Sequence, residues 1–358
     1  MRRCRSSALM CAVLAMAALA GSRLPAAGAA GGATNPVAGR PWGIYEGSGD
    51  GLWPAYEHSG GRTHRLLGRM ALHARVRSYG SWISTGDVGN VIAKDIAQEQ
   101  DGNPDVLVWI EIFRLWPHQE AANHEPLSKA DQQAYRDWID AAARGIGSAP
   151  VGIVLEPDLP LTLVSWGPKV RARLARYAAK VLSALPNATV YLDGGSADWL
   201  PVSQLVKLLE AAGVRYTRGF DLGASHHDST AAEIRYGRAV ATGLGHDGFS
   251  GKHFVVDTSD NGQPYTNKQF YAKYPKPRHN ANNPPACKTM SQRVCVSLGV
   301  PPTTDVANAK WRLPARVAKA ASRYVDAFVW IGHPWKINNG HDFNLQHALD
   351  AARTDPFF

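Results

Sequence analysis

Two carboxylic acids separated by a single proline, Glu156 and Asp158, follow the apolar stretch Val151 to Leu155. This stretch lacks the alternation of a half-buried strand, which is typical of a parallel strand covered on both faces. Pro157 cannot donate to a sheet ladder, so we expect the strand to end before it. Carboxyl groups at such an end can exchange protons with a ligand, so this pair is either a solvated turn or part of an active site.

Apolar segments of the same kind recur along the chain and alternate with segments of helical periodicity. We expect strands within residues 74–82, 105–113, 151–158, 189–195, 214–222, 252–259 and 325–332, and helices within 129–145, 170–185, 201–213, 229–244 and 313–325. This alternation indicates a parallel sheet with helical crossovers, and about seven such units predict an α/β fold, a distorted TIM-like (β/α) barrel in a single domain. An open doubly wound sheet is the alternative, but no glycine-rich dinucleotide fingerprint follows the first expected strand.

Function in such barrels gathers at the carboxyl ends of the strands. The expected ends carry acidic, basic and tryptophan side chains, namely Arg114, Trp116, Glu156, Asp158, Asp193, Asp221, Asp257, Asp260, Trp335 and Lys336. Carboxylic acids can protonate a glycosidic oxygen, and aromatic faces can hold sugar rings. This combination around one mouth favours a carbohydrate site.

The first 29 residues have the features of a secretory signal peptide, with a basic start, an apolar run and small residues near an expected cleavage site at Ala29. The apolar run is too short for a good membrane span. Loss of Arg2, Arg3, Arg5 and Arg23 lowers the formal charge of +9 by four, to about +5. Because no run of Lys and Arg marks a nucleic-acid surface, we expect no nucleic-acid partner. The signal peptide and the short apolar run predict a secreted protein without a membrane partner, and we expect it to be a monomer.

The remainder of the 358-residue chain is expected to form one folded unit. Residues 30–61 are rich in Gly and Pro and predict an extended arm, and residues 62–358 predict the barrel itself. Apolar residues make up 45% of the chain and charged residues 19%, which is enough to bury a large core and argues against disorder.

Cysteine usage fits an exported protein. Cys4 and Cys11 leave with the expected signal peptide, and Cys287 and Cys295 are close enough in sequence to form one short-loop disulfide. Residues 226–228, His-His-Asp, resemble a metal cluster, but adjacent side chains point apart and no third spaced ligand follows. We therefore expect neither a metal nor another cofactor.

Several segments of the chain resemble glycoside hydrolase family 6, the inverting cellulases that include endoglucanases and cellobiohydrolases. They read NPVAGRPWGIY, VLEPD, YLDGGSADWL, RGFDLGASHHDST, KHFVVDTSDNGQ, and VSLGVPPTT followed by VDAFVWIG. The resemblance implies hydrolysis of β-1,4-glucosidic bonds of cellulose or a related β-glucan with inversion. It also implies that Asp158 is the general acid and that Trp42 and Trp199 contact sugar.

The chain departs from the family pattern where the family has its other acidic groups. Trp116 stands where the family has an Asp that supports the acid, and Asn338 stands where it has an Asp proposed as the base. Further replacements are Ile110 for a Tyr, Leu115 for an Arg, Ser196 for a His, Gly332 for a Lys, Lys336 for a Glu and Val294 for a Trp. An asparagine cannot take a proton from water at neutral pH, so the base must be another group.

The remaining carboxylic acids near the expected mouth provide the candidates for this base. They are Glu111, Asp193 and Asp260, and inversion requires the acid and base carboxyls to lie roughly 6.5–9.5 Å apart. A base acting through a chain of waters is also open. The residues expected to bind substrate are Trp42, Trp116, Ser196, Trp199, His226, Trp335 and Lys336.

Two other functions remain open from the sequence. Trp116 and Asn338 are compatible with a glycan-binding protein that has lost catalysis. Arg114 and Lys336 near the expected mouth would suit an enzyme that acts on a different, anionic polysaccharide.

Overall fold

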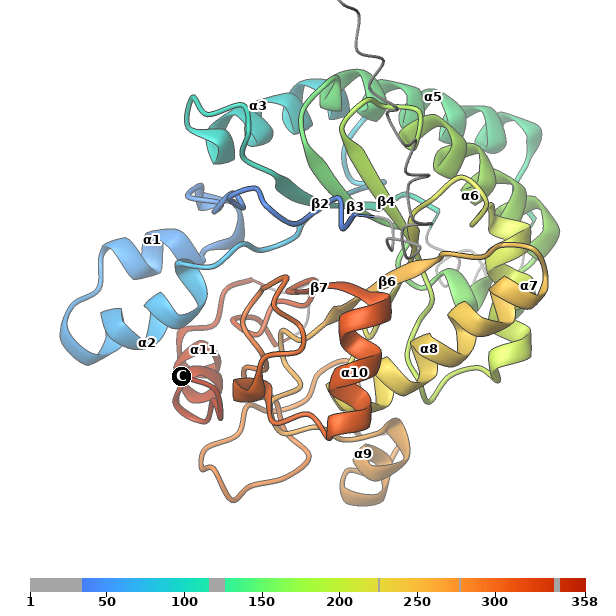
Figure 1. Cartoon of the computed structure of the whole chain (residues 1–358). Helices are drawn as coiled ribbons and strands as arrows, with labels where there is room; N and C mark the ends of the chain where they lie inside the picture. The colour runs from blue at the N-terminus through green and yellow to red at the C-terminus, as the bar shows by residue number, and fades with distance from the viewer. Residues whose placement is uncertain (1–33, 116–125, 225, 277, 338–341) are drawn as a thin grey trace, which may run out of the picture. The chain divides into compact units, whose positions relative to one another are not determined.

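The structure, a computed structural model, describes residues 34–115, 126–224, 226–276, 278–337 and 342–358. Its centre is a seven-stranded sheet in which every neighbouring pair is parallel and the strand order follows the chain, from β1 to β7 (Figure 1). The strands are β1 (Arg77–Gly80), β2 (Val108–Phe113), β3 (Val151–Leu155), β4 (Ala188–Asp193), β5 (Gly219–Leu222), β6 (His253–Asp257) and β7 (Val325–Val329). This sheet confirms the predicted distorted barrel.

Helices cover the outer face of the curled sheet, and α3, α5, α6, α7, α8 and α10 pack against one another in succession (Figure 1). The helices are α1 (Leu52–Glu57), α2 (Gly61–Ala71), α3 (Val88–Gln100), α5 (Lys129–Ile146), α6 (Pro168–Leu182), α7 (Val202–Ala212), α8 (Thr230–His246), α9 (Asn267–Lys273), α10 (Ala315–Tyr324) and α11 (Leu345–Arg353), with 3₁₀ turns η1 (Ser48–Asp50), η2 (Leu159–Leu163) and η3 (Ala309–Trp311). The local sequence determines where several of these helices begin. Ser128 and Asp131 form a capping box at α5, for example.

The two faces of the sheet belong to different hydrophobic clusters. Side chains such as Ile110 and Ile153 point outward and pack with the helices. The alternate positions point into the barrel, where Trp109, Val154 and Tyr191 form an inner cluster with other strand residues. The inner cluster fills the barrel interior, as expected for a closed or nearly closed sheet.

The expected N-terminal arm is partly regular structure. Residues 41–43 run parallel to Leu107, just before β2, with 2.9 Å hydrogen bonds from Gly43 N to Leu107 O and from Leu107 N to Pro41 O. Farther along, residues 52–57 form α1, so this part of the segment is not extended. A backbone hydrogen bond from Val76 N to Trp330 O (2.9 Å) lies between the edge strands, just before β1 and just after β7.

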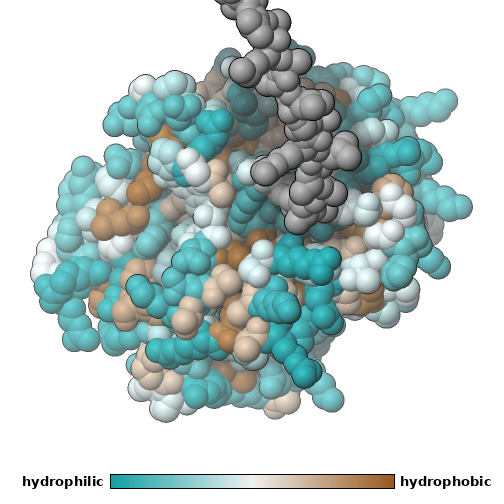
Figure 2. Space-filling model, viewed as in Figure 1, coloured by the Kyte–Doolittle hydropathy of each residue, from teal (hydrophilic) through white to brown (hydrophobic). Residues whose placement is uncertain are grey.

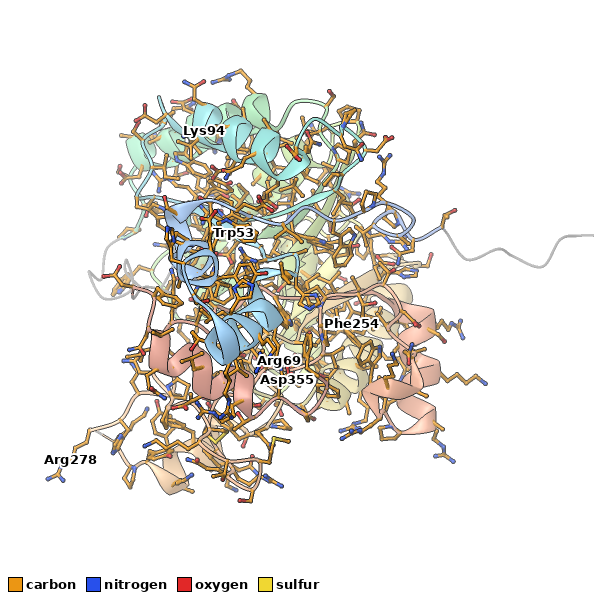
Figure 3. All side chains as sticks on the ribbon, turned by 90° about the vertical axis from the view of Figure 1, so that its left-hand side faces the viewer. Trp53, Arg69, Lys94, Phe254, Arg278 and Asp355 are labelled. Carbon is orange, nitrogen blue, oxygen red and sulfur yellow. A yellow bond between two sulfur atoms is a disulfide. The ribbon has the colours of Figure 1, made fainter. Side chains whose placement is uncertain are left out.

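A second, smaller core lies beside the barrel, where α1 and α2 pack with α11 (Figure 1). Its buried residues include Leu67 and Met70 of α2, Ala351 of α11, and Trp335 from the segment after β7. Figure 3 shows Arg69 of α2 beside Asp355, which follows α11. Segments from the two ends of the chain therefore stabilise each other.

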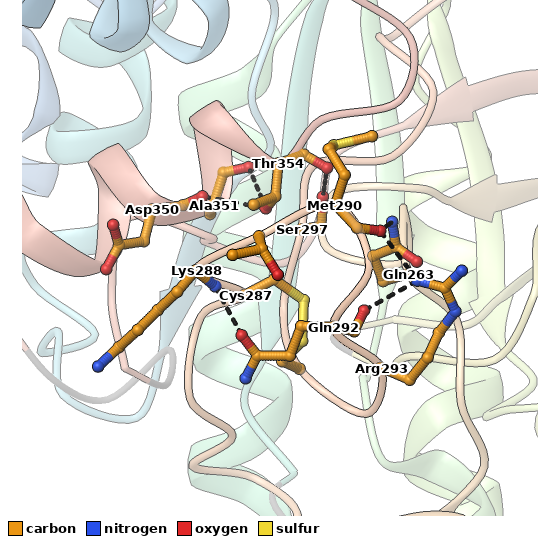
Figure 4. The surroundings of a disulfide bond; sticks show 12 residues. Gln263, Cys287, Lys288, Met290, Gln292, Arg293, Ser297, Asp350, Ala351 and Thr354 are labelled. Atoms are coloured by element: carbon orange, nitrogen blue, oxygen red, sulfur yellow. Dashed lines mark hydrogen bonds between the residues drawn. A yellow bond between two sulfur atoms is a disulfide. The ribbon is translucent and has the colours of Figure 1, made fainter.

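The predicted disulfide joins Cys287 and Cys295, whose Cα atoms are 5.0 Å apart, on the long segment between α9 and η3 (Figure 4). Nearby hydrogen bonds from Lys288 N to Gln292 Oε1 (2.9 Å) and from Gln263 Nε2 to Met290 O (3.2 Å) stabilise this segment. Hydrophilic side chains cover much of the face in Figure 2, with apolar ones between them. None of the helices in the described ranges is long and apolar enough to cross a membrane, and the expected signal peptide lies outside those ranges.

Candidate active site

The turn after β3 holds both carboxylic acids of the opening motif in an unusual backbone conformation. Glu156 has φ of 59° and Asp158 has φ of 65°, the left-handed region that residues other than glycine rarely adopt. Hydrogen bonds from Leu159 N to Glu156 O (3.0 Å) and from Leu161 N to Asp158 O (2.9 Å) hold the turn and start η2. Such conformations cost energy and cluster at functional sites. They place a partly exposed Asp158 at the carboxyl end of the barrel.

Asp193, the last residue of β4, supports this turn from below. Its carboxyl oxygens accept hydrogen bonds from Leu159 N (3.1 Å) and Gly195 N (3.1 Å). Burial raises the pKa of Asp193 to about 7, and the negative charge of Asp158 contributes to the rise. Asp193 therefore holds the backbone of Leu159, the residue after Asp158. Its own pKa also depends on whether Asp158 is ionised.

Asp221 on the neighbouring strand β5 forms a carboxyl pair with Asp193. Burial raises the pKa of Asp221 well above its ordinary value, and a hydrogen bond with Asp193 raises it further. Among the described residues, no N–H or O–H group donates to either carboxyl oxygen of Asp221. The raised pKa favours the protonated form of Asp221 beside Asp193.

Glu111 points into the barrel from β2 and is only 4% exposed. Burial raises its pKa to about 8, and the charges of Asp158 and Asp193 add to this, while a hydrogen bond from Ser78 opposes it. The side chain is therefore mostly neutral at pH 7. A neutral carboxylic acid cannot accept a proton, which weighs against Glu111 as the base.

Glu156 does not join this group. Its Oε1 accepts a hydrogen bond from the Tyr135 hydroxyl (2.6 Å), and its Oε2 accepts bonds from Leu115 N (2.7 Å) and Arg114 N (3.2 Å). Burial raises the pKa of Glu156 to about 7 although these bonds lower it. Glu156 thus secures the segment after β2 through the backbone N–H groups of Arg114 and Leu115.

A second group of side chains lines the mouth beside Asp158. The indole of Trp199 meets the ring of His226 edge-on, with centroids 4.4 Å apart, and Trp199 also packs near Gly195. Burial lowers the pKa of His226, and the charge of Asp158 is among the influences that oppose this. Trp199 and His226 are therefore in contact, and His226 lies within electrostatic reach of Asp158.

Ser196 is held by a buried acid that sequence reasoning did not single out. Its hydroxyl donates to Glu233 Oε1 (2.8 Å), which also accepts from Ala197 N (3.1 Å). Burial raises the pKa of Glu233 to about 8. Glu233 lies on the buried face of α8 with Gly237. A carboxylic acid on the apolar face of a helix was the available signal, because such a group needs a partner.

Asp260 lies on the segment after β6 and faces a histidine of the loop after β5. Its Oδ1 is 3.4 Å from His227 Nδ1, and both side chains are buried. His227 lines a small pocket with Ser196, Asp198, His226, Asp228 and Tyr265, among others. Within the described ranges, no group of three or more His, Cys, Asp or Glu side chains is arranged to hold a metal ion.

A model of the Glycosyl hydrolases family 6 matches residues 71–336. The chain belongs to this family. Residues of all seven strands fall within the match, as does the turn that carries Asp158. The resemblance to this family is therefore confirmed, although the segment NPVAGRPWGIY, residues 35–45, precedes the matched range.

Two endoglucanases are similar in sequence to part of this chain. Endoglucanase 1 of Streptomyces halstedii is 32% identical over 209 residues, which are 56% of this chain and 63% of the relative. Endoglucanase A of Cellulomonas fimi is 32% identical over 207 residues, or 56% of this chain and 43% of the relative. The chain thus spans less than two thirds of either relative.

A solved structure of the family agrees over more of the chain. The endoglucanase Cel6 from Mycobacterium tuberculosis, solved in complex with methyl-cellobiosyl-4-deoxy-4-thio-β-D-cellobioside, superimposes with a TM-score of 0.69 at 27% identity. The superposition covers 89% of this chain and 99% of that one. The fold of the barrel is therefore that of a family 6 endoglucanase.

Two of the tryptophans expected to bind substrate have different surroundings. Trp42 adjoins the amino end of β2, where its indole N–H donates to Val37 O (3.0 Å) and its ring meets Trp109. Trp335 is fully buried in the core formed by α1, α2 and α11, so neither ring face can stack on a sugar. This burial corrects the expectation that Trp335 binds substrate.

Lys336 is half-buried at the edge of the barrel. Burial lowers its pKa, while the nearby Asp50 raises it and Arg77 lowers it. Lys336 therefore lies within electrostatic reach of Asp50 and of Arg77 on β1. Trp116 and Asn338, the departures at acidic positions of the family, lie outside the described residues.

Proposed function

We propose that this chain is a secreted glycoside hydrolase that cleaves β-1,4-glucosidic bonds of cellulose or a related β-glucan with inversion. The proposal is carried by one observation: a partly exposed Asp158 in a left-handed turn at the barrel mouth, held from below by Asp193. Family membership and the endoglucanase names of the relatives support the substrate class.

Asp158 would act as the general acid. In the proposed step its proton passes to the departing glycosidic oxygen, while a water molecule attacks the anomeric carbon from the opposite face and loses a proton to a base. Burial raises the pKa of both Asp193 and Asp221, which lie beside this site. Because the charge of Asp158 raises the pKa of Asp193, the two groups do not readily ionise together, which favours a proton being held in this region.

Trp199 and His226 would hold a sugar ring beside the acid. Trp199 is only partly buried, unlike Trp335, so part of its indole can meet a ligand. Aromatic faces offer apolar contact to sugar rings, and the neighbouring imidazole offers a hydrogen-bonding edge. The relative from Mycobacterium tuberculosis was solved with a thio-linked cello-oligosaccharide, which supports a glucan ligand for the same barrel.

Secretion rests on the first 29 residues and on the disulfide. A bond between Cys287 and Cys295 fits an oxidising compartment, since thiols are kept reduced in the cytosol. Sequencing the N-terminus of the exported protein tests this part, and we expect it to begin near Ala30.

The stereochemical test follows the first product of soluble β-glucan hydrolysis by NMR. An inverting enzyme acting on a β-linkage releases the α-anomer first, before mutarotation. Release of the β-anomer would contradict inversion. Binding of cello-oligosaccharides without any product would instead support the glycan-binding alternative that Trp116 and Asn338 left open.

A further inference from the structure

The reaction needs a proton acceptor, and the carboxyl groups closest to Asp158 are poorly suited to that role. Glu111 is mostly neutral below a pKa of about 8. Asp193 already accepts two backbone hydrogen bonds and pairs with Asp221. Asn338 has no basic oxygen at neutral pH. Other candidates for the base lie on the segments after β5 and β6.

His227 and Asp260 meet there in the arrangement of a carboxylate that orients an imidazole. His227 Nδ1 lies 3.4 Å from Asp260 Oδ1, and catalytic hydrogen bonds are often this long in enzymes without a bound substrate. The ring of His227 stacks on Tyr265 with centroids 4.7 Å apart, and Tyr265 N donates to His227 O (2.8 Å). The imidazole is therefore held both through its face and through its backbone.

The carboxyl group of Asp260 determines which ring nitrogen of His227 can accept a proton. Nδ1 is buried and lies 3.4 Å from Asp260 Oδ1. A proton on Nδ1 points toward the carboxylate, which leaves Nε2 as the acceptor. The side chain of His227 also lines the pocket described above.

This pocket lies beside the turn that carries Asp158. Its free volume of about 10 Å³ is close to what one water molecule requires. Ser196 lines the pocket, and the preceding Gly195 packs against Pro160 of the turn. A water in this pocket would therefore lie next to His227.

We propose that His227, oriented by Asp260, is the base that takes a proton from the attacking water; this inference rests on the proposed hydrolase function. The water oxygen forms a bond to the anomeric carbon, and one O–H bond breaks as its proton passes to Nε2. The bond to the leaving oxygen breaks as that oxygen takes the proton of Asp158. Afterwards the proton on Nε2 returns to solvent and Asp158 regains one, so the atoms and charges balance.

The pH dependence follows from the groups around the imidazole. Asp260 faces His227 from the β6 segment, His347 from α11, Tyr265 from the segment before α9, and His226 from its own loop. A general base accepts a proton only in its unprotonated form, so turnover should show an acidic limb in its pH profile. Protonation of His226 or His347 would add to this by repelling a second positive charge.

The decisive variant is His227→Gln, assayed as kcat and KM on soluble β-glucan with and without sodium azide. Loss of a general base lowers kcat by about 10²- to 10⁴-fold with little change in KM. Azide needs no base, so it should restore turnover and yield an α-glycosyl azide. The matched control is His279→Gln, an exposed loop histidine whose ring also lies beside a tyrosine, Tyr274 (5.3 Å), and it should keep full activity.

Asp260→Asn provides a second measurement if His227→Gln folds poorly. An amide cannot stabilise the charged imidazole, so we expect a smaller loss of kcat and an acidic limb of the pH profile moved to lower pH. Full kcat in His227→Gln, a loss that azide does not rescue, or an unmoved acidic limb in Asp260→Asn would overturn the proposal. If the wild type forms no product, the hydrolase function itself fails; if only His227→Gln is unaffected, this inference alone fails.

Discussion

The two ends of the barrel interior differ in chemistry although the same strands build both. Three strands carry an apolar or aromatic side chain nearer the amino end and a carboxylic acid two residues later, in the pairs Trp109 and Glu111, Tyr191 and Asp193, and Val255 and Asp257. Residues two apart on a strand share a face, so both members of each pair point inward. The amino end is therefore packed, and the carboxyl end concentrates titratable groups.

Buried carboxyl groups at the two ends also differ in their charged partners and in the direction of their pKa shifts. Near the amino end, Asp326 contacts Arg218 (2.8 Å) and His253 (3.0 Å), and these partners lower its pKa although burial opposes them. Among the described residues, neither Asp193 nor Asp221 forms a salt bridge, and burial raises the pKa of both. A paired acid serves stability, whereas acids without cations hold protons that can be moved.

The largest expected effect comes from removing the proton donor at the mouth. Asp158→Asn should lower turnover of β-glucan by about 10²- to 10⁴-fold, because an amide cannot protonate the leaving oxygen. Substrates with a good leaving group, which needs little protonation, should lose much less. The assay is the release of reducing sugar, compared with release of an activated aryl leaving group.

A matched control exists for this change. Asp101 also has positive φ (42°) but lies exposed at the end of α3, so Asp101→Asn tests the effect of the amide on a left-handed turn without touching the site. We expect wild-type turnover from it. If both variants lost turnover equally, the loss in Asp158→Asn could not be assigned to the missing proton donor.

The packed end should respond in stability. Trp109 is 2% exposed, contacts Gly152 closely and stacks near Tyr191, so Trp109→Ala should lower the free energy of unfolding by about 3–5 kcal/mol. Urea denaturation measures this, and the folded variant should keep the pH profile of the wild type. Trp82→Ala, at a tryptophan that is 56% exposed, is the control and should change stability little. A shifted pH profile in Trp109→Ala would contradict the division between the two ends.

Glu111→Gln tests the acid end through the pH dependence of stability. Glu111 has a pKa of about 8 in the folded protein against an ordinary value of 4.5, so between these values the folded chain holds a proton that the unfolded chain has lost. Stability therefore falls as the pH rises through this window, by about 1.4 kcal/mol per pH unit for one group. Glutamine does not titrate, so Glu111→Gln removes this contribution to the slope of the unfolding free energy against pH.

Unfolding free energies at pH 6 and pH 7 provide the measurement for this variant. The difference between the two values should be smaller in Glu111→Gln than in the wild type by about 1.4 kcal/mol. Glu57→Gln, at an exposed glutamate at the end of α1, should leave the wild-type difference intact. An unchanged slope in Glu111→Gln would mean that Glu111 is ionised in the folded protein.

Much of this division could be predicted from the sequence. Unbroken apolar runs indicated the parallel strands, and the position of Asp158 followed from the rule that parallel strands present their carboxyl ends together. The disulfide followed from two closely spaced cysteines. These inferences succeed because each depends on short segments and on one general feature of the fold.

Other placements depend on contacts between distant segments and could not be predicted. Trp335 is buried because α2 and α11, from opposite ends of the chain, close over it. Trp42 reaches the amino end of β2 through pairing with Leu107. The side chain of Glu156 binds Tyr135 because positive φ at this residue breaks the alternation of the strand. Periodicity carries no information about any of these.

The smallest expected effect concerns one hydroxyl at the packed end. The Tyr191 hydroxyl donates to Asp326 Oδ2 (2.8 Å), and Asp326 keeps Arg218 and His253 when that bond is lost, so Tyr191→Phe should cost about 1 kcal/mol. Thermal unfolding measures the loss, and turnover should stay at the wild-type level. Tyr177→Phe removes a similar bond to Asp140 (2.7 Å) at a more exposed site and should cost less. If Tyr191→Phe instead changed the pH dependence of turnover, the amino end would take part in proton transfer, and the two ends would form a single coupled site.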